Sequence, residues 1–150
     1  MLCVKEFIEC ALDMVAAGWF ALYVDVDREL GGLTFTQWPI SSVYCSSTKS
    51  GGIVDTVFRE YTLTAEQAVT EFGLDNVSQD TAKKSKVDPD AKVSICHAIY
   101  PRTIYTIGAK LAKNMPVASC HFETESKTLL RESGYQEMPV IVPRWAVIPD

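Results

Sequence analysis

The sequence has few of the features that mark a membrane protein, an exported protein or a protein that coats nucleic acid. Its longest apolar run, Met14 to Val24, falls short of the roughly 20 residues that a membrane-spanning helix needs. No basic stretch precedes an apolar signal core at Met1. Fourteen basic residues against nineteen acidic ones give a net charge of −5, so the chain as a whole would repel duplex DNA. We therefore expect a soluble, unexported protein without a membrane partner.

Cysteine is also sparse, and its pattern excludes the small disulfide-stabilised scaffolds of secreted proteins. Five cysteines are an odd number, so at least one must stay free. They are scattered along the chain rather than densely spaced. The positions are Cys3, Cys10, Cys45, Cys96 and Cys120. A reducing compartment is the environment that this usage favours.

What is present is the composition of an ordinary globular domain. The chain has 150 residues, of which 47% are hydrophobic and 22% charged, close to the averages for soluble domains. A chain of this length can bury enough surface for a stable core. We therefore predict a single domain over residues 1–150, with no internal repeat.

Two segments carry helical signals. Apolar residues recur at helical spacing over Leu2 to Ala17, and Gly18 follows as a plausible stop. Thr64 and Gln67 form the pattern of a capping box ahead of a short helix, which Gly73 would end. The sequence therefore predicts an N-terminal helix and one short helix inserted further along the chain.

Strand patterns fill most of the rest. Runs rich in β-branched and aromatic residues are separated by short turns, which is typical of antiparallel strands that follow one another in space. The predicted strands are Trp19–Val26, Leu33–Gln37, Val43–Cys45, Ile53–Leu63, Val93–Tyr100, Pro116–Glu123 and Lys127–Arg131. Thr103–Ile107 is expected either to extend the fifth strand or to pair with it across a break.

Two further stretches are predicted to be irregular. Asp75 to Lys92 is polar with balanced charges, which indicates an exposed loop with at most one helical turn. The last part of the chain contains Pro139, Pro143 and Pro149, so we expect an extended segment without long regular pairing. The fold class is α+β: an N-terminal helix, an antiparallel β meander with one short inserted helix, and a proline-rich extended C-terminal segment.

A search for catalytic patterns is largely negative. The sequence has no phosphate-binding glycine loop, dinucleotide fingerprint, nucleophile elbow or His-Glu-x-x-His helix. Any Cys-His or Ser-His-Asp arrangement would need His97 or His121, because the chain has only two histidines. No third group is placed near either one by the sequence. We therefore predict that the chain is not an enzyme, and we assign no catalytic or cofactor-binding residue and no cofactor.

One repeated dipeptide, Cys96-His97 and Cys120-His121, could indicate a metal site. Cysteine and histidine are the ligands that zinc prefers. Neighbours on a strand point to opposite faces, however, and the short Cys-x-x-Cys spacing of zinc knuckles is missing. The other interpretation is that the cysteines are small apolar fillers on one sheet face and the histidines are partly exposed on the other. We assign no metal ligand, and a metal-supported or nucleic-acid-binding β module stays the alternative.

Several strings resemble a known family. Gly51 to Tyr61, followed by Thr64 to Val69 and then Phe72-Gly73, is similar to a signature of the portal proteins, or head-to-tail connectors, of short-tailed double-stranded DNA phages. Other strings agree with it in order along the chain. They are Asp13–Gly18, Tyr23-Val24, Trp38–Ile40, Val43-Tyr44, His97–Arg102, Lys113–Pro116, Glu132–Tyr135 and Pro139–Trp145.

The resemblance implies a structural role that the residues alone do not show. Such proteins form rings, usually dodecamers, at one capsid vertex of the virion after assembly in the host cytoplasm. The terminase motor pumps double-stranded DNA through the ring and the genome later leaves through it, while the portal itself hydrolyses nothing. Other portal subunits, capsid or scaffold proteins and tail adaptors are the implied partners.

The resemblance also implies that this chain corresponds to the wing region alone. Typical portal chains are several times longer, and the stem, clip and crown have no counterpart here. We therefore expect a fragment or a truncated prophage product that is a monomer or a small oligomer. Channel-facing, nucleic-acid-contacting and neighbour-contacting residues stay unassigned. Candidate seam residues, for which closure of the core is the favoured alternative, are Val140, Ile141, Val142, Trp145 and Val147.

Overall fold

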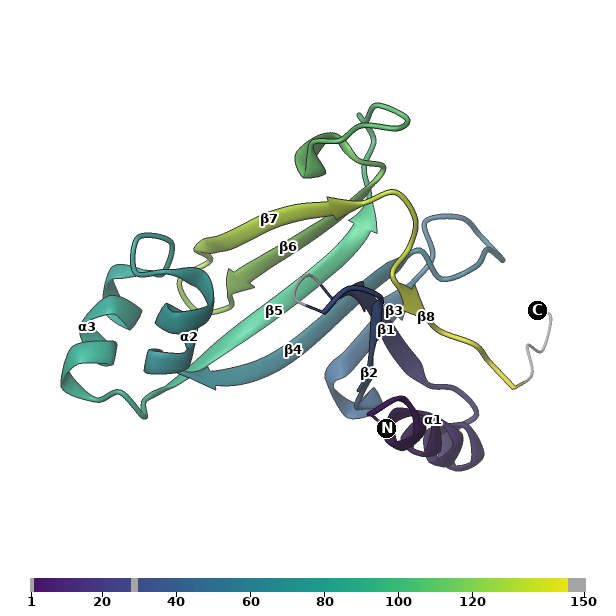
Figure 1. Cartoon of the computed structure of the whole chain (residues 1–150), viewed down its shortest axis with the longest axis horizontal. Helices are drawn as coiled ribbons and strands as arrows, with labels where there is room; N and C mark the ends of the chain where they lie inside the picture. The colour runs from purple at the N-terminus through teal and green to yellow at the C-terminus, as the bar shows by residue number, and fades with distance from the viewer. Residues whose placement is uncertain (1, 28–29, 146–150) are drawn as a thin grey trace. The chain divides into compact units, whose positions relative to one another are not determined.

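The computed structural model describes residues 2–27 and 30–145 (Figure 1). Its contacts divide the chain into two compact units. Unit 1 comprises Met1–Tyr44 with Met138–Asp150, and unit 2 comprises Cys45–Glu137. The observed elements bear out the predicted α+β class, whereas the prediction of one wing domain over residues 1–150 stays a prediction. None of the helices in the described ranges is long and apolar enough to cross a membrane.

Unit 1 is built on a three-stranded antiparallel sheet with the strand order β2-β1-β8. The predicted hairpin is confirmed: β1 (Ala21–Val26) pairs with β2 (Leu33–Trp38) over its whole length. The short strand β8 (Val140–Ile141) pairs with the other edge of β1. Trp38 is 1% exposed and stacks on Tyr23, with ring centroids 4.8 Å apart, so this aromatic pair holds the hairpin together.

The N-terminal helix α1 (Leu2–Ala17) has the predicted bounds. Gly18 ends it with φ of 79°, a left-handed conformation that glycine adopts without strain, and its N–H donates to the carbonyl oxygen of Met14 at 2.9 Å. The helix packs on β2. A one-turn 3₁₀ helix, η1 (Ile40–Ser42), follows β2.

Unit 2 is dominated by a five-stranded sheet in which neighbours in the sequence are neighbours in space, as Figure 1 shows for β4 to β7. The strand order is β3-β4-β5-β6-β7, so the predicted meander is confirmed. The strands are β3 (Val43–Ser46, at the boundary of the units), β4 (Thr56–Thr64), β5 (Lys92–Pro101), β6 (Val117–Glu123) and β7 (Leu129–Tyr135). Each pairing from β4 to β7 is antiparallel.

The inserted helix α2 (Ala65–Phe72) forms where the capping box predicted it. Gln67 N–H donates to the hydroxyl of Thr64, and the Gln67 side chain accepts from the N–H of Thr64. The apolar side of the helix lies on one end of the sheet, at the left of Figure 1. The buried cluster there comprises Ala65, Ala68, Phe72, Val77, Val93, Ile95 and Leu130.

The predicted loop from Asp75 to Lys92 is wrong in its main part, because it contains a helix of nine residues, α3 (Gln79–Val87). Ser78 caps this helix by accepting from the N–H of Thr81, and Asp80 in the first turn complements the helix dipole. Thr81 is the buried residue of the helix, so the hydrophobic periodicity that would reveal a helix is nearly missing.

Several strand bounds also differ from the prediction: β1 starts at Ala21 rather than Trp19, and β7 spans Leu129–Tyr135 rather than Lys127–Arg131. Strand β4 starts at Thr56 rather than Ile53, whose side chain is exposed. The suggested continuation at Thr103–Ile107 is not a strand: the chain bends there and leads into the 3₁₀ helix η2 (Ala112–Asn114). Apolar residues in that stretch gave it strand character, but they are exposed rather than paired on a sheet face.

Candidate functional site

The two Cys-His dipeptides lie side by side on adjacent strands but do not gather four metal ligands. His97 of β5 is directly opposite His121 of β6, and their rings stack with centroids 3.8 Å apart. Since neighbouring residues of a strand point to opposite faces, Cys96 and Cys120 lie on the other face of the sheet. Within residues 2–27 and 30–145 there is no group of three or more side chains that could hold a metal ion.

The histidine pair belongs to the packed layer between the sheet and α2. His97 is 4% exposed, so the interpretation that both histidines are partly exposed is wrong for this one. Its Nε2 lies 2.8 Å from the hydroxyl oxygen of Ser119, within hydrogen-bond distance. The ring of His121 in turn contacts the ring of Phe72 in α2, and the two ring centroids are 5.5 Å apart. The pair therefore links the helix to the middle of the sheet.

Burial keeps both imidazoles neutral. Burial first, then the neighbouring His121, Arg59 and Arg131, lowers the pKa of His97 from the usual 6.5 to about 2. Burial and the charges of Arg131 and Arg59 lower the pKa of His121 to about 4. A proton on either ring would be a buried charge beside two guanidinium groups. These rings therefore pack in the neutral form and are poor acceptors of a proton at neutral pH.

In the same layer, the guanidinium groups of two arginines lie over aromatic rings. The guanidinium of Arg131 lies 4.9 Å from the ring centroid of Phe72, and it also donates to the carbonyl oxygen of Glu71 at 2.6 Å. Arg59 lies 4.8 Å from the ring centroid of Tyr61. Burial raises the pKa of Tyr61 to about 12, so its phenol stays neutral. The layer is a structural joint that fixes α2 on the sheet.

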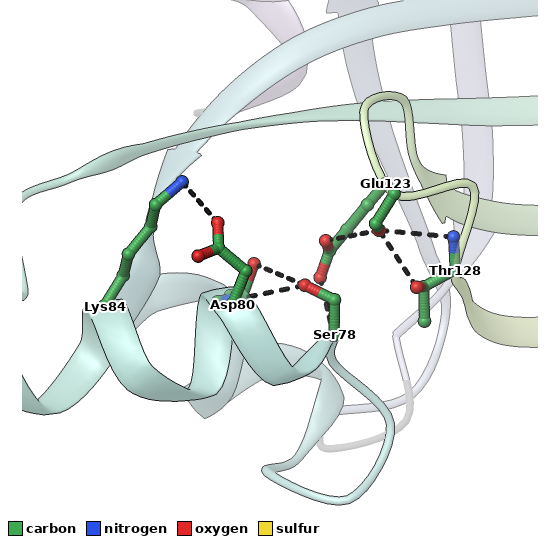
Figure 2. Close-up of polar contacts among 7 residues, drawn as sticks. Ser78, Asp80, Lys84, Glu123 and Thr128 are labelled. Carbon is green, nitrogen blue, oxygen red and sulfur yellow. Dashed lines mark hydrogen bonds and ion pairs between the residues drawn. The ribbon is translucent and has the colours of Figure 1, made fainter.

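A second polar cluster joins the start of α3 to the turn between β6 and β7 (Figure 2). Glu123 is 3% exposed, and its carboxylate accepts from the N–H of Ser78 at 2.9 Å and from the hydroxyl of Ser126 at 2.7 Å. Burial alone would raise the pKa of Glu123, but these hydrogen bonds outweigh it and lower the pKa. At neutral pH the buried carboxylate is therefore charged and satisfied.

This cluster borders a small cavity of about 240 Å³. On the α3 side, the ammonium of Lys84 pairs with the carboxylate of Asp80 at 2.6 Å, as Figure 2 shows. The carboxylate of Glu123 already has its donors from the protein. Lys84 and Asp80 thus bind each other, Glu123 binds uncharged donors, and the contact of Glu123 with Ser78 anchors the start of α3.

The candidate seam residues fall into different environments. Val140 is buried in β8 and closes the core of unit 1, whereas Ile141 beside it is about half exposed. Val142 is partly buried, and Val147 lies outside the described residues. Trp145 is exposed, although its backbone N–H donates to the carbonyl oxygen of Gly18 at 2.7 Å. Val140 therefore closes the core of unit 1, whereas Ile141 and Trp145 lie on the surface.

The sequence analysis did not identify an exposed apolar surface on α1 of unit 1. Five large apolar side chains of α1 are each more than half exposed. They are Val4, Phe7, Ile8, Leu12 and Val15. Their helical spacing was visible in the sequence, but the direction in which the stripe points depends on contacts with β2 that periodicity alone does not reveal.

Comparison with known proteins places these features in a family. Residues 4–150 match the family described as "Bacteriophage head to tail connecting protein". The portal protein of Salmonella phage epsilon15 is 40% identical over 115 residues, which cover 73% of this chain and 20% of that protein. A protein named "Probable portal protein" of Bordetella phage BPP-1 is 37% identical over 111 residues, 70% of this chain and 20% of the relative. The matched part thus spans about a fifth of the length of each relative.

Proposed function

The chain belongs to the family of bacteriophage head to tail connecting proteins, and from this membership we propose that it forms the wing of a phage portal subunit. The observation that carries the proposal is the family match over residues 4–150. Two relatives of at least 37% identity, one named a portal protein and the other a probable portal protein, support it. The family description gives a connecting role and no reaction, so the proposed role is structural.

On this proposal, the chain is part of a ring, dodecameric in the parent protein, at one vertex of the capsid. Double-stranded DNA passes through the channel of that ring during packaging and ejection. The proposed partners are other portal subunits, the terminase, capsid or scaffold proteins and tail adaptors. Assembly takes place in the cytoplasm of the bacterial host, and the product is a component of the virion.

The packing of unit 2 supports such a role, because a ring subunit needs a body that keeps its shape under load. The sheet is a meander of local pairings, and its helices are fixed by two independent sets of contacts. The histidine pair and Arg131 hold α2, while Glu123 and Ser126 hold the start of α3. The hydrogen-bonded carboxylate of Glu123 is a satisfied buried polar group, and such groups rigidify a core.

No observation favours the alternative of a metal-supported or nucleic-acid-binding module. The cysteines and histidines that suggested it lie on opposite faces of the sheet. Zinc quantification on the purified chain would reopen it if a stoichiometric ion were found.

Immunogold electron microscopy tests the proposal directly. Antibodies raised against this chain should label a single vertex of phage particles released from the host that carries the gene. Particles from a host with the gene deleted are the control, and they should be unlabelled or missing. Detection of the chain in the lysate by immunoblot, with no label on any particle, would contradict a role in the virion.

A further inference from the structure

Helix α3 is attached to unit 2 mainly by polar contacts. Within Gln79–Val87, Thr81 is the buried residue, and the two apolar residues are Ala82 and Val87. Ala82 is partly buried against the main cluster, whereas Val87 is 86% exposed. Burial of apolar side chains normally holds a helix on a sheet, and α3 has little of it. Its position therefore depends on other contacts.

A cavity lies between α3 and the sheet. Its volume is about 240 Å³. Ser78, Thr81 and Lys84 line it on the helix side, while Ser94 of β5 and Ser126 of the turn after β6 line it on the opposite side. Atoms that face a cavity lack the van der Waals contacts of close packing. The helix is therefore loosely packed on this side.

The carboxylate of Glu123 connects α3 to the sheet beside this cavity (Figure 2). One of its oxygens accepts from the N–H of Ser78, the residue that caps α3, at 2.9 Å. The other oxygen accepts from the hydroxyl of Ser126 at 2.7 Å. The carboxylate is charged at neutral pH, and hydrogen bonds to a charged group are about twice as strong as neutral ones. One buried side chain of β6 thus fixes the first turn of α3.

The chain on both sides of α3 is held by contacts that do not involve Glu123. Before the helix, Val77 is buried in the main cluster. After it, the carbonyl oxygen of Ala91 accepts from the N–H of Ala65, the first residue of α2, at 2.8 Å. Residues 78–88 therefore connect two fixed points, and they can lose their helical structure without displacing either.

We propose that residues 78–88 form a detachable segment, which opens by local unfolding while α2 and the sheet stay folded, and that Glu123 is the contact that keeps it closed. A helix of nine residues is marginal in water without partners, so α3 unfolds when it leaves the sheet. Its opening exposes little apolar surface, so it costs less free energy than unfolding of the whole unit. The inference concerns unit 2 alone, and its failure would leave the proposed portal role untouched.

Hydrogen exchange of the wild-type chain at pH 7.5, resolved by residue with NMR, tests for a separate opening. The amides of Ala82 and Asp88 donate to the carbonyl oxygens of Ser78 and Lys84. After correction for intrinsic rates, these α3 amides should exchange at least roughly tenfold faster than the slowest amides of β5. Low concentrations of urea should accelerate the β5 amides and leave the α3 amides almost unchanged, because a small opening exposes little surface.

Glu123→Gln tests the closing contact. The variant keeps one acceptor oxygen but removes the charge and the second acceptor, so the α3 amides should exchange roughly tenfold faster or more. Glu125→Gln makes the same change of charge at an exposed position of the same turn and is the matched control, with α3 exchange within about twofold of the wild type. Ser126→Ala removes one donor to Glu123 and should accelerate the same amides by a smaller factor.

Ile99→Val separates local opening from unfolding of the whole unit. Ile99 is fully buried in β5, outside the detachable segment. The variant lowers the stability of the sheet, so the slowest β5 amides should exchange about two- to tenfold faster. The α3 amides should keep the wild-type rate, since opening of residues 78–88 leaves the contacts of Ile99 intact. Circular dichroism checks that each variant is folded.

Three results would overturn the inference. The first is a wild-type chain in which the α3 amides exchange as slowly as the slowest amides of β5. The second is a folded Glu123→Gln variant with unchanged α3 exchange; if that variant does not fold, unchanged exchange in Ser126→Ala counts equally. The third is an Ile99→Val variant that accelerates α3 and β5 to the same extent, because α3 would then open only together with the sheet.

Discussion

Acid should destabilise unit 2 before any carboxylate titrates, because its two buried histidines resist protonation. In the unfolded chain each imidazole has the usual pKa of 6.5, whereas in the folded chain burial lowers the pKa to about 4 for His121 and about 2 for His97. Protons therefore bind the unfolded state more tightly. The stability contributed by the neutral pair is complete above pH 6.5 and is lost as the pH falls toward the folded values.

The size of the effect follows from the shifts. Below pH 6.5 each histidine removes about 1.4 kcal/mol of unfolding free energy per pH unit until its folded pKa is reached. At pH 5 the loss is about 2 kcal/mol per histidine, or about 4 kcal/mol for the pair. A domain of this size has a total stability of about 5–15 kcal/mol, so the loss is a large fraction of it.

Urea unfolding at pH 7.5 and pH 5 measures this difference. The chain has only two histidines, and other unperturbed side chains do not titrate in that window, so the double variant His97→Gln/His121→Gln is a matched control. It should be less stable at pH 7.5 but should lose almost nothing between the two pH values. The single variant His121→Gln should lose about half as much as the wild type.

Two results would refute the reasoning. One is an equal loss in the wild type and the double variant, which would assign the acid sensitivity to other groups. The other is an NMR titration in which the ring protons of His121 shift with a midpoint near 6.5, because the ring would then be accessible to protons in the folded state.

Three further predictions concern contacts that stabilise unit 2. The first two are checked by urea unfolding with circular dichroism, and the third by hydrogen exchange. Thr64→Ala removes the cap of α2 and should lower the free energy of unfolding by about 1 kcal/mol. An unchanged unfolding midpoint would show that the cap does not stabilise the protein. Ile95→Ala leaves a cavity at a fully buried site in the main cluster and should lower the free energy of unfolding by about 2–5 kcal/mol. A decrease below about 1 kcal/mol would mean that neighbouring side chains move to fill the cavity. Gly134→Ala should displace η2, because a Cβ there would lie 2.0 Å from the carbonyl oxygen of Ala112. Faster hydrogen exchange over residues 102–116 is the expected sign, and unchanged exchange would contradict the close approach.

The elements that the sequence predicted well are those with local signals. The capping box at Thr64 and Gln67 defines α2 within a few residues, and Gly18 ends α1 through its own backbone conformation. The hairpin turn at the end of β1 is equally local. Helix α3 was missed because its single strong local signal is the cap at Ser78, and the helix depends on Glu123, far away in the sequence.

The candidate sites were harder to predict because they depend on register and rotation. Strand alternation correctly separated Cys96 from His97, but the burial of His97 requires both His121 opposite and Phe72 above the pair. The outward stripe of α1 likewise results from the contacts of Gln37 with two acids on the helix. Neither arrangement has a signature within one stretch of the chain.

The pairing of β8 with β1 means that unit 1 is made of two pieces separated by the whole of unit 2. During synthesis, the strands of unit 2 therefore leave the ribosome before the last strand of the three-stranded sheet exists. Until Val140 and Ile141 emerge, one edge of β1 has no neighbour, and its hydrogen-bonding groups are open to other nascent chains. Strand β8 therefore completes the sheet of unit 1 late, so a translational pause near position 137 would leave unit 2 finished while the hairpin of β1 and β2 still has an open edge.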